Sequence, residues 1–195
     1  MASVTERKVE AIPALDDLVA QAKAGDTASF ARLVTKYQKG IFMLAYGYFM
    51  NRDDALEIVQ ETFLKAFSSL RTLRDDSSFE GWLYRIAANL SNTAYRKKKK
   101  IILVENENIL DKQAAKSSGN DTEVLRDRFE INKNLRKAIT LLPERQKTII
   151  VMKYFQNMKL REIAEKLGLG LGTVKKHNFR AIKKLREKSG TILKD

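Results

Sequence analysis

The C-terminal part of the chain constrains the fold most strongly, because two short helical patterns flank a glycine-rich corner. The glycines of Gly168-Leu169-Gly170 can adopt the positive φ that a tight turn between helices requires. Apolar residues recur at helical spacing on both sides of it: Leu160, Ile163, Ala164 and Leu167, then Val174, Ala181, Ile182 and Leu185. A further pattern runs from Glu144 to Phe155 after Pro143, which suits a first helical position. The sequence predicts a helix-turn-helix with a supporting helix in front of it.

The second helix of this motif carries cations on the side opposite its apolar stripe. A helix of this width and charge fits the DNA major groove, where its first turns meet base edges. The candidates for base contact are Thr173, Lys175, Lys176 and His177. Arg180 is better placed for phosphate, and Arg161 in the preceding helix is a candidate for clamping the DNA backbone.

The distribution of charge supports nucleic-acid binding more strongly than the net charge of +13 does. Residues 129–195 hold 17 Lys and Arg against 6 Asp and Glu, whereas residues 1–100 hold 16 against 12. A basic surface of this kind binds phosphates and releases counterions, so binding depends on salt. The alternative is an ordinary solvated lysine-rich face, but its coincidence with the helix-turn-helix favours DNA.

Composition excludes several classes of function. The chain has no cysteine and one histidine, His177, which argues against thiol catalysis, disulfides and Cys/His metal sites. No glycine loop that could cradle phosphates follows a strand pattern. The longest apolar run, Ile41 to Met50, is too short to span a membrane. We therefore expect a cytoplasmic protein that is not an enzyme and has no cofactor, metal or small-molecule substrate.

The order of helical patterns predicts an all-α chain of two helical domains joined by a linker. We expect a tail at 1–12, a first domain at 13–100, a polar linker at 101–121 and a second domain at 122–195. Within the first domain the expected helices cover residues 15–23, 26–49, about 53–70, with Asp53 or Asp54 as cap, and 79–100. The second domain should begin with a helix over about 122–141.

The helix after Asp54 combines an apolar face with a compact acidic and amide patch. Ile58, Phe63 and Leu64 can face the core. Glu57, Gln60 and Glu61 lie within one turn on another face, where residues three and four apart are neighbours. Such a patch suits a basic coiled coil on a large partner, although periodicity alone favours an ordinary solvated helix face.

The helix that begins near Phe79 carries polar residues one turn apart. Asn89 and Asn92 can read base edges with their amides, and Arg85 and Arg96 on the same face can hold phosphates. The basic tract from Arg96 through Lys97 to Lys100 also suits phosphate. Trp82 and Tyr84 could stack on bases, but packing in the core is the more common role of such residues.

Three of these segments resemble bacterial extracytoplasmic-function sigma factors, and they occur in the family's order and spacing. The matching segments are Asp54-Ala55-Leu56-Glu57-Ile58-Val59-Gln60-Glu61-Thr62-Phe63-Leu64-Lys65-Ala66-Phe67, Phe79-Glu80-Gly81-Trp82-Leu83-Tyr84-Arg85-Ile86-Ala87-Ala88-Asn89, and Leu142-Pro143-Glu144-Arg145 with Gly172-Thr173-Val174-Lys175. The resemblance covers about residues 15–187 and implies a σ2 domain, a linker and a σ4 domain. Three positions depart from the family: Leu56 replaces a common acid, Gly170 replaces a frequent serine cap, and Asn178 replaces a usual leucine on the inward stripe. Asn178 either finds a hydrogen-bond partner in the core or turns the helix slightly.

The resemblance assigns partners to the predicted surfaces. Glu57, Gln60 and Glu61 would bind the β′ clamp helices of core RNA polymerase, with further contacts to the β subunit. The residues Arg85, Asn89, Asn92, Arg96 and Lys97 would read the promoter −10 element, and the loop 71–78 would capture an unstacked base. Arg161 and the recognition-helix residues would read the −35 element. An anti-sigma factor, sometimes held at the membrane, is also implied.

Two other functions fit parts of the sequence. One is a stand-alone helix-turn-helix regulator that binds operator DNA as a dimer, and the other is a helical nucleic-acid-binding adaptor. A dimeric regulator should carry a sensor or dimerisation domain in place of residues 15–100, which instead match a polymerase-binding domain.

Overall fold

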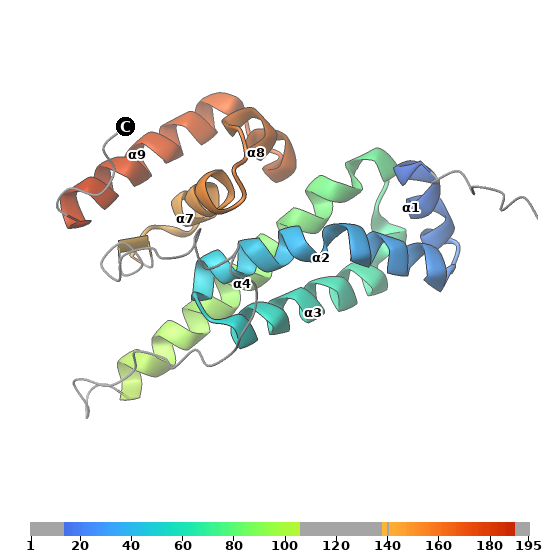
Figure 1. Cartoon of the computed structure of the whole chain (residues 1–195), viewed down its shortest axis with the longest axis horizontal. Coiled ribbons are helices and arrows are strands. Elements are labelled where there is room, and N and C mark those ends of the chain that lie inside the picture. The colour runs from blue at the N-terminus through green and yellow to red at the C-terminus, as the bar shows by residue number, and fades with distance from the viewer. Residues whose placement is uncertain (1–13, 106–137, 140, 190–195) are drawn as a thin grey trace, which may run out of the picture.

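The structure, a computed structural model, describes residues 14–105, 138–139 and 141–189, and within these residues every regular element is helical. The N-terminal group contains α1 (Leu15–Lys23), α2 (Thr27–Phe49), α3 (Arg52–Ser69) and α4 (Phe79–Glu105), with short 3₁₀ turns at Leu70–Thr72 and Asp76–Ser78. The C-terminal group contains α7 (Glu144–Ile150), a π-helical turn at Val151–Phe155, α8 (Leu160–Leu167) and α9 (Leu171–Ser189). The predicted all-α class is confirmed (Figure 1).

Several predicted helix ends were wrong, and each has a local reason. Helix α3 is capped by Asn51, whose side chain accepts from the Asp54 backbone N–H, and not by Asp53 or Asp54. Asp26 lies before α2 as its cap, accepting from the N–H groups of Ala28 and Ser29. Pro143 is likewise the cap of α7 and not its first residue.

Helix α4 extends further than its sequence pattern indicated. It runs to Glu105, so residues 101–105 belong to the helix and not to the predicted linker. The extension has a local reason, because lysine is a good helix former and residues 101–105 contain no glycine or proline that would break the helix. The rest of the predicted linker and most of the helix expected at 122–141 lie outside the described residues.

Helix α2 is the centre of the N-terminal group. Leu33, Ile41 and Leu44 are fully buried along its length, and it packs against α1, α3 and α4. Gly40 lets α4 approach closely, because a Cβ at this position would collide with the hydroxyl oxygen of Tyr84 on α4. Fully burying each large apolar side chain contributes about 1.5–3 kcal/mol, so this stripe contributes substantially to the stability of the bundle.

The predicted helix-turn-helix is present in the C-terminal group. Gly168 takes φ +63° and closes α8 in the left-handed conformation, as the corner requires. Val174, Ala181 and Leu185 of α9 are buried, as expected from their spacing. The supporting helix continues past α7 as a π-turn, where the Met158 N–H donates to the Met152 carbonyl over 3.2 Å.

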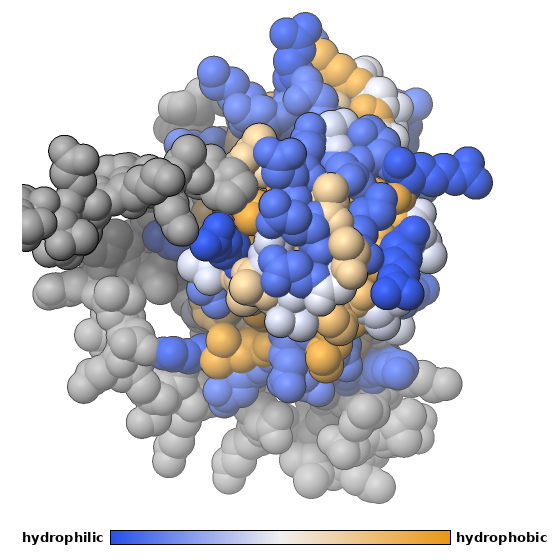
Figure 2. All heavy atoms as spheres, turned by 90° about the vertical axis from the view of Figure 1, so that its right-hand side faces the viewer, coloured by the Kyte–Doolittle hydropathy of each residue, from blue (hydrophilic) through white to orange (hydrophobic). Residues whose placement is uncertain are grey.

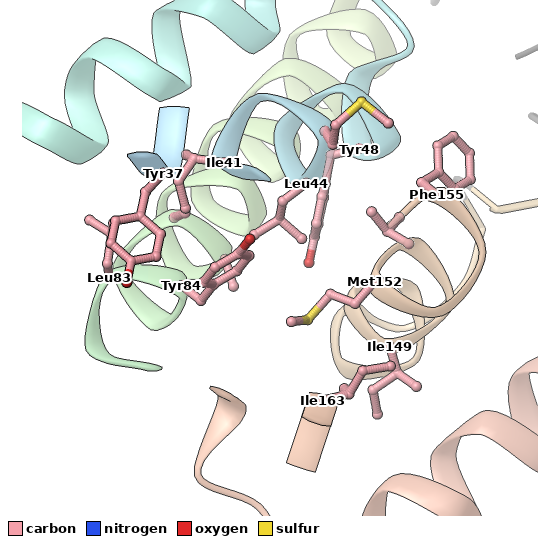
Figure 3. Packing of buried hydrophobic residues seen from close by; sticks show 14 of the residues in the cluster. Tyr37, Ile41, Leu44, Tyr48, Leu83, Tyr84, Ile149, Met152, Phe155 and Ile163 are labelled. Atoms are coloured by element: carbon pink, nitrogen blue, oxygen red, sulfur yellow. The ribbon is translucent and has the colours of Figure 1, made fainter. Parts of the chain in front are cut away.

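The two groups of helices share one apolar core. A single cluster of buried residues runs from α1 through α2 and α4 to α7, α8 and α9. Figure 3 shows Leu44, Tyr48 and Tyr84 on one side and Met152 pointing toward them from the other. The C-terminal helices therefore lie against α2 and α4 and bury apolar surface there.

The cap of α3 gives a direct test of the helix boundaries. Replacing a capping Asn by Ala removes an acceptor for an otherwise unpaired N–H, so Asn51→Ala should lower the free energy of unfolding by about 1 kcal/mol. Asp53→Ala, next to it in the first turn, should cost clearly less. Urea denaturation followed by circular dichroism measures both, and an equal loss would show that Asn51 is not the cap.

Candidate nucleic-acid interface

The outer face of α9 presents the predicted DNA-contacting side chains. Thr173, Lys175, Lys176 and Arg180 are exposed, and Arg161 is exposed on α8. Sequence reasoning did not select Phe179, which is 70% exposed on the same outer face. The sequence could have placed Phe179 on this face, because it lies three residues after Lys176 and four after Lys175. It also lies away from the apolar stripe of Val174 and Ala181.

His177 sits at the edge of this face among cations. Partial burial is the main cause that lowers its pKa, and the nearby charges of Arg145, Arg180 and Lys176 lower it further. The imidazole is therefore neutral at neutral pH, and its buried Nδ1 has no hydrogen-bond partner among the described residues. His177 can offer a hydrogen bond to DNA but adds little to the positive charge.

Asn178 lies on the inward stripe of α9. The residue is 8% exposed, and its Oδ1 has no hydrogen-bond partner among the described residues. A buried polar atom without a partner costs free energy, since it loses its hydrogen bond to water. The described residues therefore supply no hydrogen bond that would offset the burial of this oxygen.

The predicted polar face of α4 is present, but its members have different surroundings. Arg85, Asn89, Arg96 and Lys97 are exposed. Asn92 is half-buried and hydrogen-bonds to the Tyr48 hydroxyl, so its amide is already engaged. Arg96 Nε lies 3.0 Å from Glu144 Oε1 of α7, and the guanidinium of Arg85 lies against Gly168.

The aromatic residues of α4 belong mainly to the core. Tyr84 is buried against α2, and burial raises the pKa of its hydroxyl well above the usual value. Trp82 is half-buried, with its ring 6.0 Å from that of Phe79. Packing rather than base stacking is thus the observed environment of both residues.

The loop between α3 and α4 is held by a lysine that sequence reasoning missed. Lys23 at the end of α1 donates to the Leu73 carbonyl over 2.8 Å and pairs with Asp76 over 2.7 Å. Nothing local in the sequence indicates this contact, because the partners are far apart along the chain. It fixes the residues that lead into α4.

Helix α3 exposes a mixed acidic and apolar surface. Glu57, Gln60 and Glu61 are exposed as predicted, whereas the prediction that Leu64 faces the core was wrong, since Leu64 is 63% exposed. Leu56 and Phe67 are exposed on the same face, and Phe67 packs edge-on against Phe30. We call Leu56, Glu57, Gln60, Glu61, Leu64 and Phe67 the α3 surface. Its apolar centre and acidic edge are typical of a protein-binding site.

The end that carries α1 is mostly hydrophilic, with apolar side chains interspersed (Figure 2). Among the described residues, no group of His, Cys, Asp and Glu could hold a metal ion, and no helix is long and apolar enough to cross a membrane.

Comparison with known families agrees with this arrangement. Residues 33–101 match the model for sigma-70 region 2, and residues 132–185 match that for sigma-70 region 4. RNA polymerase sigma factor SigV of Bacillus subtilis is 37% identical over 78% of this chain and 86% of SigV. ECF RNA polymerase sigma factor SigW of the same organism is 32% identical over 87% of this chain and 93% of SigW. The chain belongs to the sigma-70 family, in its extracytoplasmic-function group.

Solved structures show the same fold. The structure of CnrH in complex with the cytosolic domain of CnrY aligns with a TM-score of 0.61 at 23% identity, over 90% of this chain and 96% of that one. The sigma factor RpoE of Bartonella quintana, solved in complex with the anti-sigma factor NepR, aligns with a TM-score of 0.56 at 19% identity, over 84% and 98% of the two chains.

The unpaired amide of Asn178 predicts a gain in stability on substitution. Asn178→Leu removes the buried oxygen and fills the stripe with an apolar side chain, so it should raise the free energy of unfolding by about 1–3 kcal/mol. Thermal melting measures the change. A lower melting temperature would mean that the amide has a structural role that its surroundings do not reveal.

Proposed function

We propose that this sigma factor gives core RNA polymerase its promoter specificity through three surfaces on three helices. The α3 surface binds the polymerase, the polar face of α4 reads the −10 strand, and the outer face of α9 reads the −35 duplex. The observation that supports this most strongly is the presence of both sigma regions in one chain, in the family's order. A stand-alone regulator would account for residues 132–185 only, so it is not favoured.

The α3 surface suits the β′ clamp helices on grounds of charge and shape. Glu57 and Glu61 supply negative charge for a basic coiled coil, and Leu56 and Leu64 supply an apolar centre that water leaves on binding. At position 56, where the family commonly has an acidic residue, Leu56 would then make an apolar contact with the clamp helices in place of an ionic one.

The DNA-reading faces suit different forms of DNA. On α9, Lys175 and Lys176 can donate to guanine, Arg180 and Arg161 can hold phosphates, and the exposed ring of Phe179 can contact a thymine methyl group. On α4, Asn89 is the exposed amide for a base, and Arg85, Arg96 and Lys97 are cations for the strand that carries it. Asn92 acts through its bond to Tyr48 and so positions the helix.

We further infer that the chain is a regulatory subunit and not itself an enzyme, and that an anti-sigma factor controls it. The two aligned solved structures are complexes, one with CnrY and the other with an anti-sigma factor. An anti-sigma factor anchored in a membrane would hold this chain at that surface until released.

Charge reversal on α3 tests the polymerase surface. Glu57→Lys with Glu61→Lys should abolish co-purification with core RNA polymerase, because the acidic edge would then repel a basic partner. The matched control is Asp16→Lys with Asp17→Lys on α1, which are exposed acids in a first turn and give the same change in net charge. Retained polymerase binding in the α3 variant, or equal loss in the control, would contradict the assignment.

Run-off transcription with core polymerase on a matrix of promoter variants tests the DNA surfaces. Loss of a base contact costs about 1–3 kcal/mol and relaxes discrimination at that position. Lys175→Ala, Lys176→Ala and Phe179→Ala should therefore blunt the effect of −35 substitutions and leave −10 preference intact. Asn89→Ala should do the reverse. If the α9 variants changed −10 preference as strongly as −35 preference, the division of labour would be wrong.

A further inference from the structure

The loop 71–78 leads directly into the helix proposed to read the −10 strand, and it lies beside the end of α1 (Figure 1). Arg71 and Arg74 of this loop are exposed, whereas Leu73, between them in the sequence, is 6% exposed and belongs to the core. The backbone is therefore anchored by Leu73 while both arginines remain in solvent. Cations placed in this way suit the backbone of a single strand.

Lys23, at the end of α1, holds this loop at two points. Its Nζ donates to the Leu73 carbonyl oxygen over 2.8 Å and to Asp76 Oδ1 over 2.7 Å. Leu73 closes the first 3₁₀ turn of the loop and Asp76 begins the second. An ammonium group has three donors, so one side chain can hold both turns in a fixed relation. We call these two hydrogen bonds the Lys23 contact.

The lysine is itself placed by a well-packed helix. Leu18, Val19 and Ala22 of α1 are buried in the core. Lys23 follows them in the last turn of α1, where the helix dipole favours a cation. Its side chain is 24% exposed and that of Asp76 is 26% exposed, so solvent screens this ion pair only in part. A rigid element far away in the sequence thus determines where the loop lies.

The second half of the loop also has hydrogen bonds of its own. Asp75 Oδ1 accepts from the Ser77 N–H over 3.1 Å and from the Ser77 hydroxyl over 2.7 Å. The Ser78 hydroxyl donates to the Asp75 carbonyl oxygen over 2.7 Å. These bonds are local and shape the second turn, whereas the Lys23 contact ties this turn to α1.

We propose that Lys23 is a positioning residue for −10 recognition, which holds the loop 71–78 in its strand-receiving conformation before DNA arrives. This proposal rests on the proposed function of α4 as the −10 reader. A loop that is already ordered loses less entropy on binding, so it binds the strand more tightly and in one register. Without the Lys23 contact, Arg74 and the second turn would adopt several positions, and strands of different sequence would be accepted more equally.

Lys23 also neutralises Asp76, and this charge effect must be separated from positioning. A carboxylate without a compensating cation would repel the phosphates of any strand, whatever its base sequence. Loss of positioning instead changes the ratio between promoters, because phosphate effects are nearly uniform across sequences. The decisive measurement is therefore the ratio of initiation at the preferred −10 sequence to initiation at its single-base variants.

Lys23→Met tests the positioning role, because it removes the ammonium group and keeps an unbranched side chain with good helix preference. In run-off transcription with core RNA polymerase, this variant should lower the −10 preference by about tenfold, as the loss of one base contact would, and leave −35 preference unchanged. Lys23→Arg can donate to the same two acceptors and should retain the preference. The matched control is Lys39→Met, which removes an equal charge from an exposed position on α2.

Asp76→Ala distinguishes positioning from a direct contact between Lys23 and a phosphate. If Lys23 bound phosphate directly, its release from Asp76 would strengthen initiation at every promoter and leave the ratios unchanged. If Lys23 positions the loop, Asp76→Ala should lower the −10 preference, by a smaller factor than Lys23→Met because the bond to the Leu73 carbonyl remains. The double variant should then equal Lys23→Met alone, since both changes remove the same interaction.

The outcomes separate this proposal from the proposed function. Unchanged −10 preference in Lys23→Met, while Asn89→Ala still relaxes it, would overturn the positioning role and leave the proposed function intact. Equal loss in Lys39→Met, or stronger initiation at every promoter in Asp76→Ala, would overturn it as well. If wild-type protein initiates at no promoter, the proposed function fails and the positioning role fails with it.

Loss of preference in Lys23→Met that Lys23→Arg does not show, together with the expected result of the double variant, would establish the positioning role. Thermal melting checks that each variant keeps its fold, since a partly exposed ion pair adds little to global stability. Hydrogen exchange of the loop amides should be faster in Lys23→Met and in Asp76→Ala than in Lys39→Met.

Discussion

The burial of α2 is the constraint on which the rest of the structure depends. Leu33, Ile41 and Leu44 on this helix are fully buried, and its neighbours α1, α3 and α4 are positioned by packing against it. With α2 as the common support, α3 can turn its acidic edge outward and α4 can present a row of polar residues. The same helix also contacts the C-terminal group through Gly47, so it links the surfaces proposed to bind polymerase and to read DNA.

The electrostatic design separates two kinds of contact. Exposed cations on α9 face solvent, where salt screens them and where they can exchange counterions for phosphates. Lys147 is instead withdrawn from water and held between aromatic rings, where it serves packing. Net charge alone does not distinguish these roles, because both count equally toward the total of +13.

Much of the fold could be predicted from the sequence, because helical periodicity and the Gly168 corner are local signals. The exposed members of the candidate sites, such as Glu57 and Lys176, followed from the same periodicity. The errors arose where competing local signals determine a helix cap, or where contacts between residues far apart in the chain determine burial. The spacing of Leu64 fits an inward-facing stripe, yet no neighbouring helix among the described residues covers it, and it is exposed. The cap of α3 is Asn51 and not one of the two aspartates that follow it. The packing of Val151 against Gly47 joins residues far apart in the chain, so no local pattern could indicate it.

The contact between Gly47 and Val151 also has a consequence for sequence variation. A side chain larger than hydrogen at position 47 leaves no room for a branched one at position 151, so the two positions share a fixed total volume. In a lineage that retains the contact, substitutions at these positions must occur as compensating pairs. Tight packing between the two groups of helices therefore ties the evolution of one to that of the other.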